Sequence, residues 1–155
     1  MQSAISPQAL RPLDISDRPT FLAHLLRLGP KGRYSRFSMT MSDAAIAAYV
    51  ADHFKETNFY VGYFDKADLR GVAEAHCMDL DGNNVELAFS IELGWRGHGL
   101  GEALFDRVLQ TARQRGVRAL HIHCLANNFA MVSLIRHFGG RVLFDGHDAS
   151  AVITL

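Results

Sequence analysis

Hydrophobic residues recur every three to four positions in the first third of the chain, which is the spacing of amphipathic helices. This pattern predicts helices over Ser16–Leu28 and Asp43–Phe54, each with an N-cap residue at its start. Gly29, Pro30 and Gly32 separate the two segments. Because glycine and proline interrupt regular structure, the stretch between the helices is predicted to be a loop.

The middle of the chain is rich in aromatic and β-branched residues, which favour strands. Strands are predicted over Phe59–Phe64, Gly71–Leu80 and Val85–Leu93. Asp81-Gly82 lies between the last two and predicts a hairpin. Since side chains alternate along a strand, Glu86 is expected on the face opposite to its apolar neighbours.

Helical and strand patterns alternate in the remainder of the chain. A long helix is predicted over Gly99–Arg115, a strand over Val117–Cys124, and a helix from Asn127 to Phe138. Two strands follow, over Arg141–Phe144 and Ala149–Leu155. The order ααβββαβαββ predicts an α/β layer fold with hairpins early and strand–helix alternation late.

Composition is that of an ordinary folded protein. The chain has 155 residues, of which 48% are hydrophobic and 21% are charged. This length predicts one domain over residues 1–155, and the balance excludes a disordered protein. Cys77 and Cys124 stand alone, without metal-ligand spacing, so neither a disulfide framework nor a metal site is expected.

The net charge is zero, with 16 basic and 16 acidic residues. This balance argues against a protein that binds nucleic acid or anionic membrane over its whole surface. The charges are nevertheless divided, because the segment from Arg107 to Arg141 contains six arginines and no acidic residue. The division suggests an anionic ligand in the C-terminal half, or simply a basic surface there.

The N-terminal segment MQSAISPQAL lacks the basic start and apolar run of a signal peptide. No apolar run reaches the ~18 residues needed to span a bilayer. A cytoplasmic location without membrane attachment is therefore expected.

The segment SIELGWRGHGLG, residues 90–101, places three glycines among five residues between a predicted strand and a predicted helix. Glycine lets the backbone approach a ligand closely, and a helix N-terminus favours negative charge. The segment therefore predicts a phosphate-binding turn. It matches neither the GxGxxG pattern of dinucleotide folds nor the GK[ST] of P-loop proteins. A tight strand-to-helix turn without a ligand is the alternative.

Arg96–Gly101 resembles the Q/R-x-x-G-x-G/A motif of the GCN5-related N-acetyltransferase (GNAT) superfamily. Two further segments strengthen the resemblance. Asn127-Asn128-Phe129-Ala130-Met131 is similar to the N-x-x-A/M segment, and Phe138-Gly139-Gly140 is similar to the closing turn. The resemblance implies a mixed, mostly antiparallel twisted sheet with helices on both faces. It also implies acetyl-CoA as the acyl donor and an amine as the acceptor, and it is compatible with a homodimer.

The resemblance also assigns cofactor contacts. It implies that the main chain of Phe89, Ser90 and Ile91 pairs with the pantetheine arm. The pyrophosphate is implied to bind the glycine turn, and Asn127 to contact the cofactor from the next helix. The residues of the turn are Arg96, Gly97, His98, Gly99, Leu100 and Gly101.

Glu86 is the candidate catalytic base, because an amine must lose a proton to attack a thioester. A solvated or ion-paired strand residue is the alternative. Glu86 matches the strand glutamate that several members of the family use. Burial on a central strand is expected to raise its pKa. Glu92 is the second candidate and is expected to be structural. Leu134 occupies the position where many members carry a tyrosine general acid.

Tyr34-Ser35-Arg36-Phe37 resembles a segment of protein-lysine acetyltransferases, which favours a lysine or related primary amine as the acceptor. Lys31, Arg33 and Arg36 are expected to be solvated. The resemblance places their segment beside the acceptor site, which leaves room for an anionic feature on the acceptor.

Two other functions compete with acetyl transfer. Because Leu134 replaces the usual tyrosine, a non-catalytic sensor that binds acyl-CoA is one alternative. The other is a nucleic-acid module, which only the C-terminal arginines suggest. Such a module would bind DNA or RNA with a steep dependence on salt, and no such binding is expected of this protein. Metal binding by His121 and His123, which share a strand face, is not expected.

Overall fold

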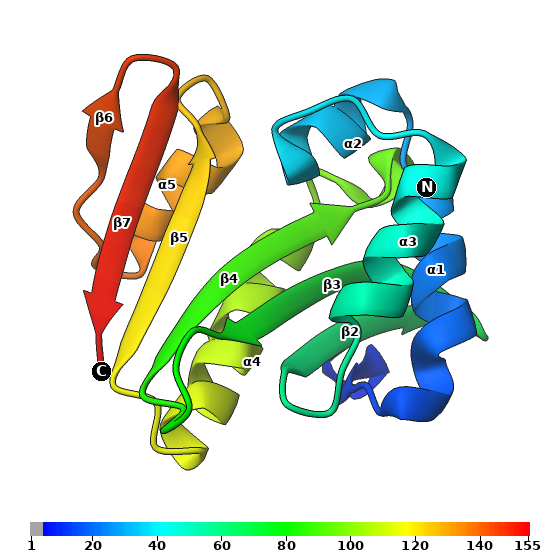
Figure 1. Cartoon of the computed structure of the whole chain (residues 1–155), viewed down its shortest axis with the longest axis horizontal. Helices are drawn as coiled ribbons and strands as arrows, with labels where there is room; N and C mark the ends of the chain where they lie inside the picture. The colour runs from blue at the N-terminus through cyan, green and yellow to red at the C-terminus, as the bar shows by residue number, and fades with distance from the viewer. Residues whose placement is uncertain (1–4) are drawn as a thin grey trace.

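The computed structural model describes residues 5–155, in which helices cover both faces of a seven-stranded sheet (Figure 1). The first four residues of the segment considered for a signal peptide lie outside this description. The strands are β1 (Leu10–Pro12), β2 (Phe59–Asp65), β3 (Asp68–Cys77), β4 (Asn84–Ile91), β5 (Ala119–Leu125), β6 (Leu143–Asp145) and β7 (Asp148–Thr154). The helices are α1 (Arg18–Arg27), α2 (Pro30–Phe37), α3 (Asp43–His53), α4 (Leu100–Gln114) and α5 (Phe129–His137), with 3-10 turns at Pro7–Ala9, Ile15–Asp17 and Leu93–Trp95.

The strands run in the order β1-β2-β3-β4-β5-β7-β6. Every neighbouring pair is antiparallel except β4 and β5, which confirms the mixed, mostly antiparallel sheet. The parallel pairing covers only residues 84–87 of β4 and 119–122 of β5. Beyond Leu87 the two strands diverge, and the sheet forks (Figure 1).

Two apolar clusters fill the space between the layers. Leu104 and Val108 of α4 are buried in a cluster on one face of the sheet. On the other face, Phe21 of α1 and Ile46 of α3 belong to the second cluster. The helical spacing of these residues in the sequence therefore corresponds to the buried stripe of each helix.

Helix α2 corrects the loop predicted between the first two helices. Pro30 occupies the first turn of α2, where its missing N–H costs nothing. Arg33 is not solvated, because its guanidinium donates to the backbone carbonyls of Leu28, Leu26 and Met41. These bonds fasten α2 to its neighbours and provide stability that its own sequence lacks.

Two smaller features also differ from the sequence pattern. The short edge strand β1 was not predicted, and it pairs with β2. The predicted hairpin between β3 and β4 is confirmed, but its connection spans residues 78–83 rather than two residues. Asp79 closes this loop, because its side chain accepts hydrogen bonds from the backbone N–H groups of Asn83 and Asn84.

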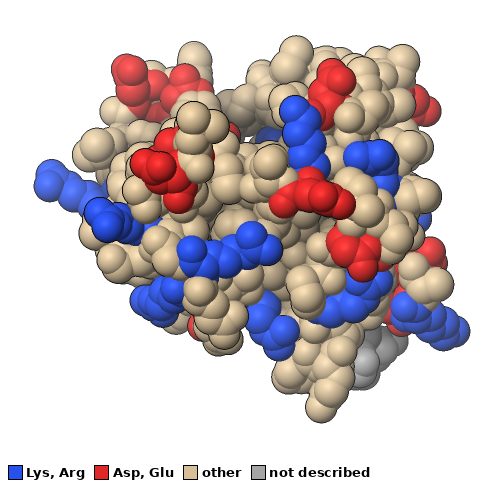
Figure 2. Space-filling model, turned by 60° about the horizontal axis from the view of Figure 1, so that its bottom comes forward, with Lys and Arg blue, Asp and Glu red and all other residues tan. Residues whose placement is uncertain are grey.

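Within residues 5–155, no helix has both the length and the apolar character required to cross a bilayer. Basic and acidic side chains are interspersed on the face drawn in Figure 2.

Candidate functional site

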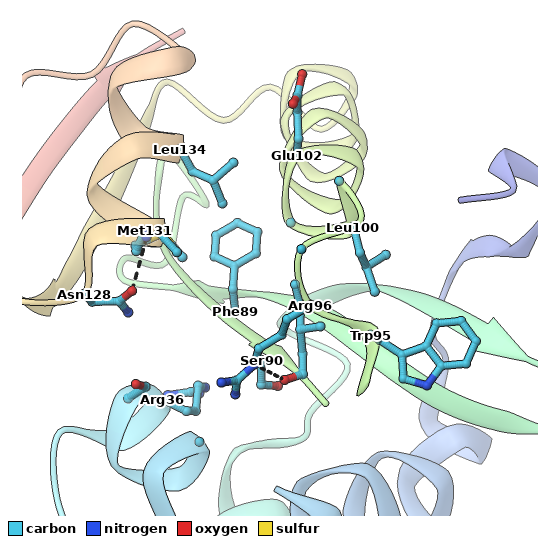
Figure 3. A pocket seen from close by; sticks show the side chains of 17 residues that line it. Arg36, Phe89, Ser90, Trp95, Arg96, Leu100, Glu102, Asn128, Met131 and Leu134 are labelled. Atoms are coloured by element: carbon cyan, nitrogen blue, oxygen red, sulfur yellow. Dashed lines mark hydrogen bonds between the residues drawn. The ribbon is translucent and has the colours of Figure 1, made fainter. Parts of the chain in front are cut away.

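The fork between β4 and β5 opens onto a cavity of about 350 Å³, here called the fork cavity (Figure 3). It is bordered by α2, by the free edge of β4, by the glycine turn and by the first turns of α4 and α5. The lining residues are Gly32, Ser35, Arg36, Phe89, Ser90, Ile91, Trp95, Arg96, Gly97, Gly99, Leu100, Gly101, Glu102, Asn128, Ala130, Met131 and Leu134.

Most of the predicted cofactor contacts come together in this cavity. Phe89, Ser90 and Ile91 line it from β4, on the stretch that has lost its β5 partner. His98 and Asn127 are exposed and do not line it. Asn128 does, and its side-chain oxygen accepts a hydrogen bond from the backbone N–H of Met131 at the start of α5.

The glycine turn has the backbone geometry expected of a phosphate-binding turn. Gly97 and Gly99 have φ angles of 76° and 82°, a region that glycine enters without strain. Gly99 is the N-cap of α4, and no side chain caps this helix. The N–H groups of its first turn are therefore available to an anionic ligand, which the helix dipole also favours.

Gly101 allows α4 and α5 to approach each other. A Cβ atom at this position would lie 3.0 Å from Cδ1 of Leu134. The side chain at the usual tyrosine position therefore packs against the glycine turn. A larger residue at position 101 would reduce the space at the fork.

The Arg96 side chain extends from the glycine turn along the cavity towards α2 (Figure 3). Its Nε donates a hydrogen bond of 2.9 Å to the backbone carbonyl of Ile91. Its Nη2 lies 3.1 Å from the point that a Cβ on Gly32 would occupy. The absence of a side chain at Gly32 thus leaves room for the Arg96 guanidinium. The Ile91 carbonyl, which lies on the edge of β4 without a strand partner, already accepts a hydrogen bond from Arg96.

The charge division in the sequence does not mark this cavity. Among the described lining residues, the basic side chains are those of Arg36 and Arg96. None of the six arginines between Arg107 and Arg141 lines it. The run of arginines after residue 106 is therefore a surface property, and both cations of the cavity precede it in the sequence.

A buried histidine of α1 contacts two side chains at the end of β4. His24 of α1 is completely buried, with Nδ1 2.9 Å from Oε2 of Glu92 and Nε2 2.8 Å from Oγ of Ser90. Arg27 and Arg70 also donate to the Glu92 carboxylate. Glu92 is therefore a structural residue, as predicted.

The environment of Glu92 changes its acidity. Burial alone would raise the pKa of the carboxyl group, but the hydrogen bonds from His24, Arg27 and Arg70 outweigh it and lower the pKa to about 2. The carboxylate thus stays ionised and keeps the end of β4 attached to α1 and β3.

A stack of three aromatic rings supports the fork from the other face. The ring of Phe105 lies 5.2 Å from that of Phe89 and 4.3 Å from that of Phe138, and all three are nearly parallel. Because Phe105 belongs to α4 and Phe138 follows α5, the stack connects both sides of the fork.

A second cavity of about 340 Å³, here called the Glu86 cavity, lies on the side of α2 and α3. Its lining residues are Arg36, Tyr49, His53, His76, Cys77, Met78, Glu86 and Ala88. Glu86 is exposed, which corrects the burial expected for it on a central strand. Its carboxylate makes no hydrogen bond or ion pair with any residue of the described chain, which leaves both oxygens available to a ligand.

The wall between the two cavities contains a buried ion pair that the sequence did not reveal. Glu74 of β3 is fully buried, and Nε of Arg36 donates to its Oε2 at 2.9 Å. Tyr49 donates to Oε1 of the same carboxylate at 2.7 Å, and His76 lies 3.0 Å from that oxygen. Arg36 is therefore not solvated, contrary to expectation.

The pKa values of this cluster depart from their ordinary ranges. Burial would raise the pKa of Glu74, but Arg36 and His76 outweigh it and hold it well below its usual range. The pKa of Arg36 is raised, because the charge of Glu74 outweighs the effect of burial. Burial and the Glu74 charge raise the pKa of Tyr49. All three groups thus keep fixed protonation states at neutral pH.

The remaining histidines considered as metal ligands have other partners. Nε2 of His121 lies 2.8 Å from the side-chain oxygen of Asn84, and His123 lies 3.5 Å from Asp148. Residues 5–155 contain no group of three or more histidine, cysteine or acidic side chains arranged to hold a metal ion.

Two comparisons with known proteins, one with family models and one with solved structures, give matches, and a third does not. The family model described as "Acetyltransferase (GNAT) domain" matches residues 9–141. A search of curated protein sequences finds no match. Solved structures with the same fold include the GNAT domain of S. lividans PAT, at 17% identity and a TM-score of 0.80, covering 94% of this chain and 89% of that chain.

Two other solved structures illustrate the range of similar proteins. The ribosomal-protein-S18-alanine N-acetyltransferase from Escherichia coli is 18% identical with a TM-score of 0.67, covering 94% of this chain and 91% of that chain. The PaiA N-acetyltransferase from Thermoplasma acidophilum, solved in complex with coenzyme A, is 16% identical with a TM-score of 0.68, covering 94% and 98%. At these identities the likeness shows the fold alone.

Proposed function

The chain belongs to the acetyltransferase (GNAT) domain family, and from this membership we propose that it transfers an acetyl group from acetyl-CoA to a primary amine. The observation that carries the proposal is the pair of cavities that meet at Arg36. One is lined by an unpaired strand edge and a glycine turn, which would suit a pantetheine and a pyrophosphate, and the other contains an unpaired carboxylate.

The fork cavity is the proposed acetyl-CoA site. The main chain of β4 over Phe89, Ser90 and Ile91 would pair with the amides of the pantetheine arm on the side of the strand that β5 no longer occupies. The pyrophosphate would bind the N–H groups between Gly97 and Gly101. The Arg96 guanidinium would exchange its bond with Ile91 for a phosphate oxygen.

The Glu86 cavity is the proposed amine site. The Glu86 carboxylate would attract the acceptor as an ammonium ion and accept a proton from it, directly or through water. The amine lone pair then attacks the thioester carbon and forms the C–N bond. The nitrogen of the tetrahedral intermediate then loses its second proton to water. Collapse of the intermediate breaks the C–S bond and leaves the neutral amide, and CoA departs as a thiolate that takes a proton from solvent.

The acceptor is proposed to be a protein lysine or a small primary amine. Glu86 supports either, since a carboxylate is complementary to any ammonium group. Leu134 cannot act as a general acid. The mechanism does not require one, because the CoA thiolate can leave without prior protonation and then take a proton from water.

A non-catalytic acyl-CoA sensor is the second candidate, supported by Leu134 in the cavity wall. The two functions are distinguished by incubating the protein with acetyl-CoA and a panel of amines and lysine peptides. Release of CoA thiol and an acetylated product of the correct mass supports the enzyme. Tight acetyl-CoA binding without turnover on any amine supports the sensor and contradicts the enzyme.

We also propose that residues 1–155 form one acetyl-CoA-binding domain and that the protein acts in the cytoplasm. Formation of a homodimer is a further proposal. Sedimentation of the purified protein at several concentrations tests it directly.

A further inference from the structure

Arg36 is the residue that lines both cavities. It lies on the last turn of α2, and Figure 3 shows its side chain at the edge of the fork cavity, on the opposite side from α4. If the acetyl group enters through one cavity and the amine through the other, the reacting atoms meet beside this side chain.

The guanidinium is held rigidly on two of its three nitrogens. Nε and Nη2 donate to the two oxygens of Glu74 at 2.9 and 3.0 Å, and Nη2 also donates to the hydroxyl of Tyr49 at 2.6 Å. The Arg36 side chain is only 10% exposed. The side chain therefore pays no ordering cost when a ligand arrives, because its position is already fixed.

The third nitrogen has no partner. No residue in the described part of the chain accepts a hydrogen bond from Nη1 of Arg36, although every other N–H of the group is used. Nη1 is also reached by solvent, because Arg70 Nε is the one fully buried side-chain nitrogen or oxygen without a partner among the described residues. A charged donor is thus fixed at the junction of the two cavities and left open.

From this geometry we propose that Nη1 of Arg36 donates a hydrogen bond to the thioester oxygen and stabilises the oxyanion of the tetrahedral intermediate. The proposal rests on the acetyl transfer proposed above. It makes Arg36 a catalytic residue, and it makes Glu74 and Tyr49 positioning residues that act through Arg36.

The electrons balance without a further reactant. When the amine attacks, the π electrons of the carbonyl move onto oxygen, and the Arg36 N–H groups face the new negative charge. When the intermediate collapses, that pair reforms the carbonyl and expels the CoA thiolate. Arg36 keeps its proton throughout and supplies charge and geometry, because its raised pKa excludes proton transfer.

The buried ion pair between Arg36 and Glu74 also explains why arginine, and not lysine, is needed at position 36. Glu74 fixes the guanidinium through two nitrogens, which a lysine ammonium cannot reproduce together with a third donor in the same plane. Arginine is therefore required for the third hydrogen bond, although lysine would preserve the charge.

The test is the steady-state kinetics of Arg36→Lys, with Arg33→Lys as the matched control. Arg33 lies on the same helix and lines neither cavity, and its guanidinium binds backbone carbonyls. For Arg36→Lys we expect kcat to fall about 100-fold, the effect of removing one oxyanion donor, with little change in KM for acetyl-CoA. For Arg33→Lys we expect a lower Tm and an unchanged kcat.

A double variant tests the inference even if Arg36→Lys fails to fold. Combining Arg36→Gln with Glu74→Gln removes both buried charges, so no uncompensated charge is left to destabilise the protein. We expect it to bind acetyl-CoA and to lose the same factor in kcat. Added guanidinium ion, but not ammonium, should restore part of the rate to Arg36→Ala.

The outcomes separate this inference from the proposed function. If the wild-type protein acetylates no amine, the proposed function and the inference both fail. If the wild type is active and Arg36→Lys or the double variant keeps its kcat, only the inference fails. An equal loss of kcat in Arg33→Lys, or a loss confined to KM, assigns Arg36 a purely structural role and also overturns it.

Discussion

Glu86 on β4 and His76 on β3 are direct register partners, so the free carboxylate and the imidazole lie side by side on one face of the sheet. The two groups differ in their surroundings. His76 is bound to the Glu74 carboxylate and to Asn58, whereas Glu86 has no partner in the described chain. This face of the sheet therefore presents the unpaired charge of Glu86 to the Glu86 cavity, and a negative charge there favours a cationic ligand.

The first prediction concerns this carboxylate. Glu86→Gln keeps the shape of the side chain but removes its ability to accept a proton. We expect kcat for amine acetylation to fall about 10²- to 10⁴-fold, the usual contribution of a general base. Calorimetry should show unchanged acetyl-CoA affinity. Glu56→Gln, which changes an exposed glutamate outside both cavities, is the control, and full activity in Glu86→Gln would remove Glu86 as the base.

The second prediction concerns acid stability. The pKa of Glu92 is lowered from 4.5 to about 2 in the folded protein, so its ionised form stabilises the fold. That contribution is complete above pH 4.5 and is lost as the pH falls from 4.5 towards 2. The loss is on the order of 3 kcal/mol at most. Urea unfolding across this range should show a shallower pH dependence for Glu92→Gln than for the wild type; equal slopes would contradict the assignment.

The third prediction concerns the glycine turn. Gly99 has a φ of 82° with open space around its Cα, so Gly99→Ala meets backbone strain but no steric clash. We expect a stability loss of about 1–2 kcal/mol and weaker acetyl-CoA binding. Gly29→Ala is the matched control, because Gly29 has an equally open position and a φ of −68° that alanine adopts readily. Equal effects at the two positions would argue against a role for the positive φ.

The fourth prediction concerns the aromatic stack. Phe105→Ala removes a fully buried ring between Phe89 and Phe138, and we expect it to lower the free energy of unfolding by about 3–5 kcal/mol. Affinity for acetyl-CoA should fall as well, because Phe89 loses its support. Phe144→Ala, at an exposed ring, should change stability by only ~0.5 kcal/mol. A small effect of Phe105→Ala on both measurements would count against the stack as a support of the fork.

Sequence periodicity predicted the elements whose apolar residues face a single layer, such as α4 and β4. It failed at α2, where glycine and proline outweighed any local signal. The bonds that stabilise α2 come from Arg33 to carbonyls up to eight residues away and from Arg36 to Glu74. Local propensity contains no information about such tertiary bonds, so the sequence pattern predicts a loop where the structure has a helix.

The candidate site divides in the same way. The backbone geometry of the glycine turn could be predicted, because a short motif specifies it, and the strand that supplies the β4 edge follows from its alternating pattern. The Arg36–Glu74 pair could not, since its members are 38 positions apart and each is ordinary by itself. The one signal available was a buried acid in an apolar strand: Glu74 lies between Ala73 and Ala75. Charge in such a position requires a partner.

The short parallel pairing between β4 and β5 also has a mechanical consequence. Four residue pairs form a seam that joins the C-terminal strands to the rest of the sheet. Opening of this seam separates β5 and β7 from β4 without disturbing the cluster around Phe21, so amide protons of β5 should exchange faster than those of β3. If acetyl-CoA binds along the free edge of β4, as proposed, it would lengthen the seam, and the fold would gain rigidity on binding.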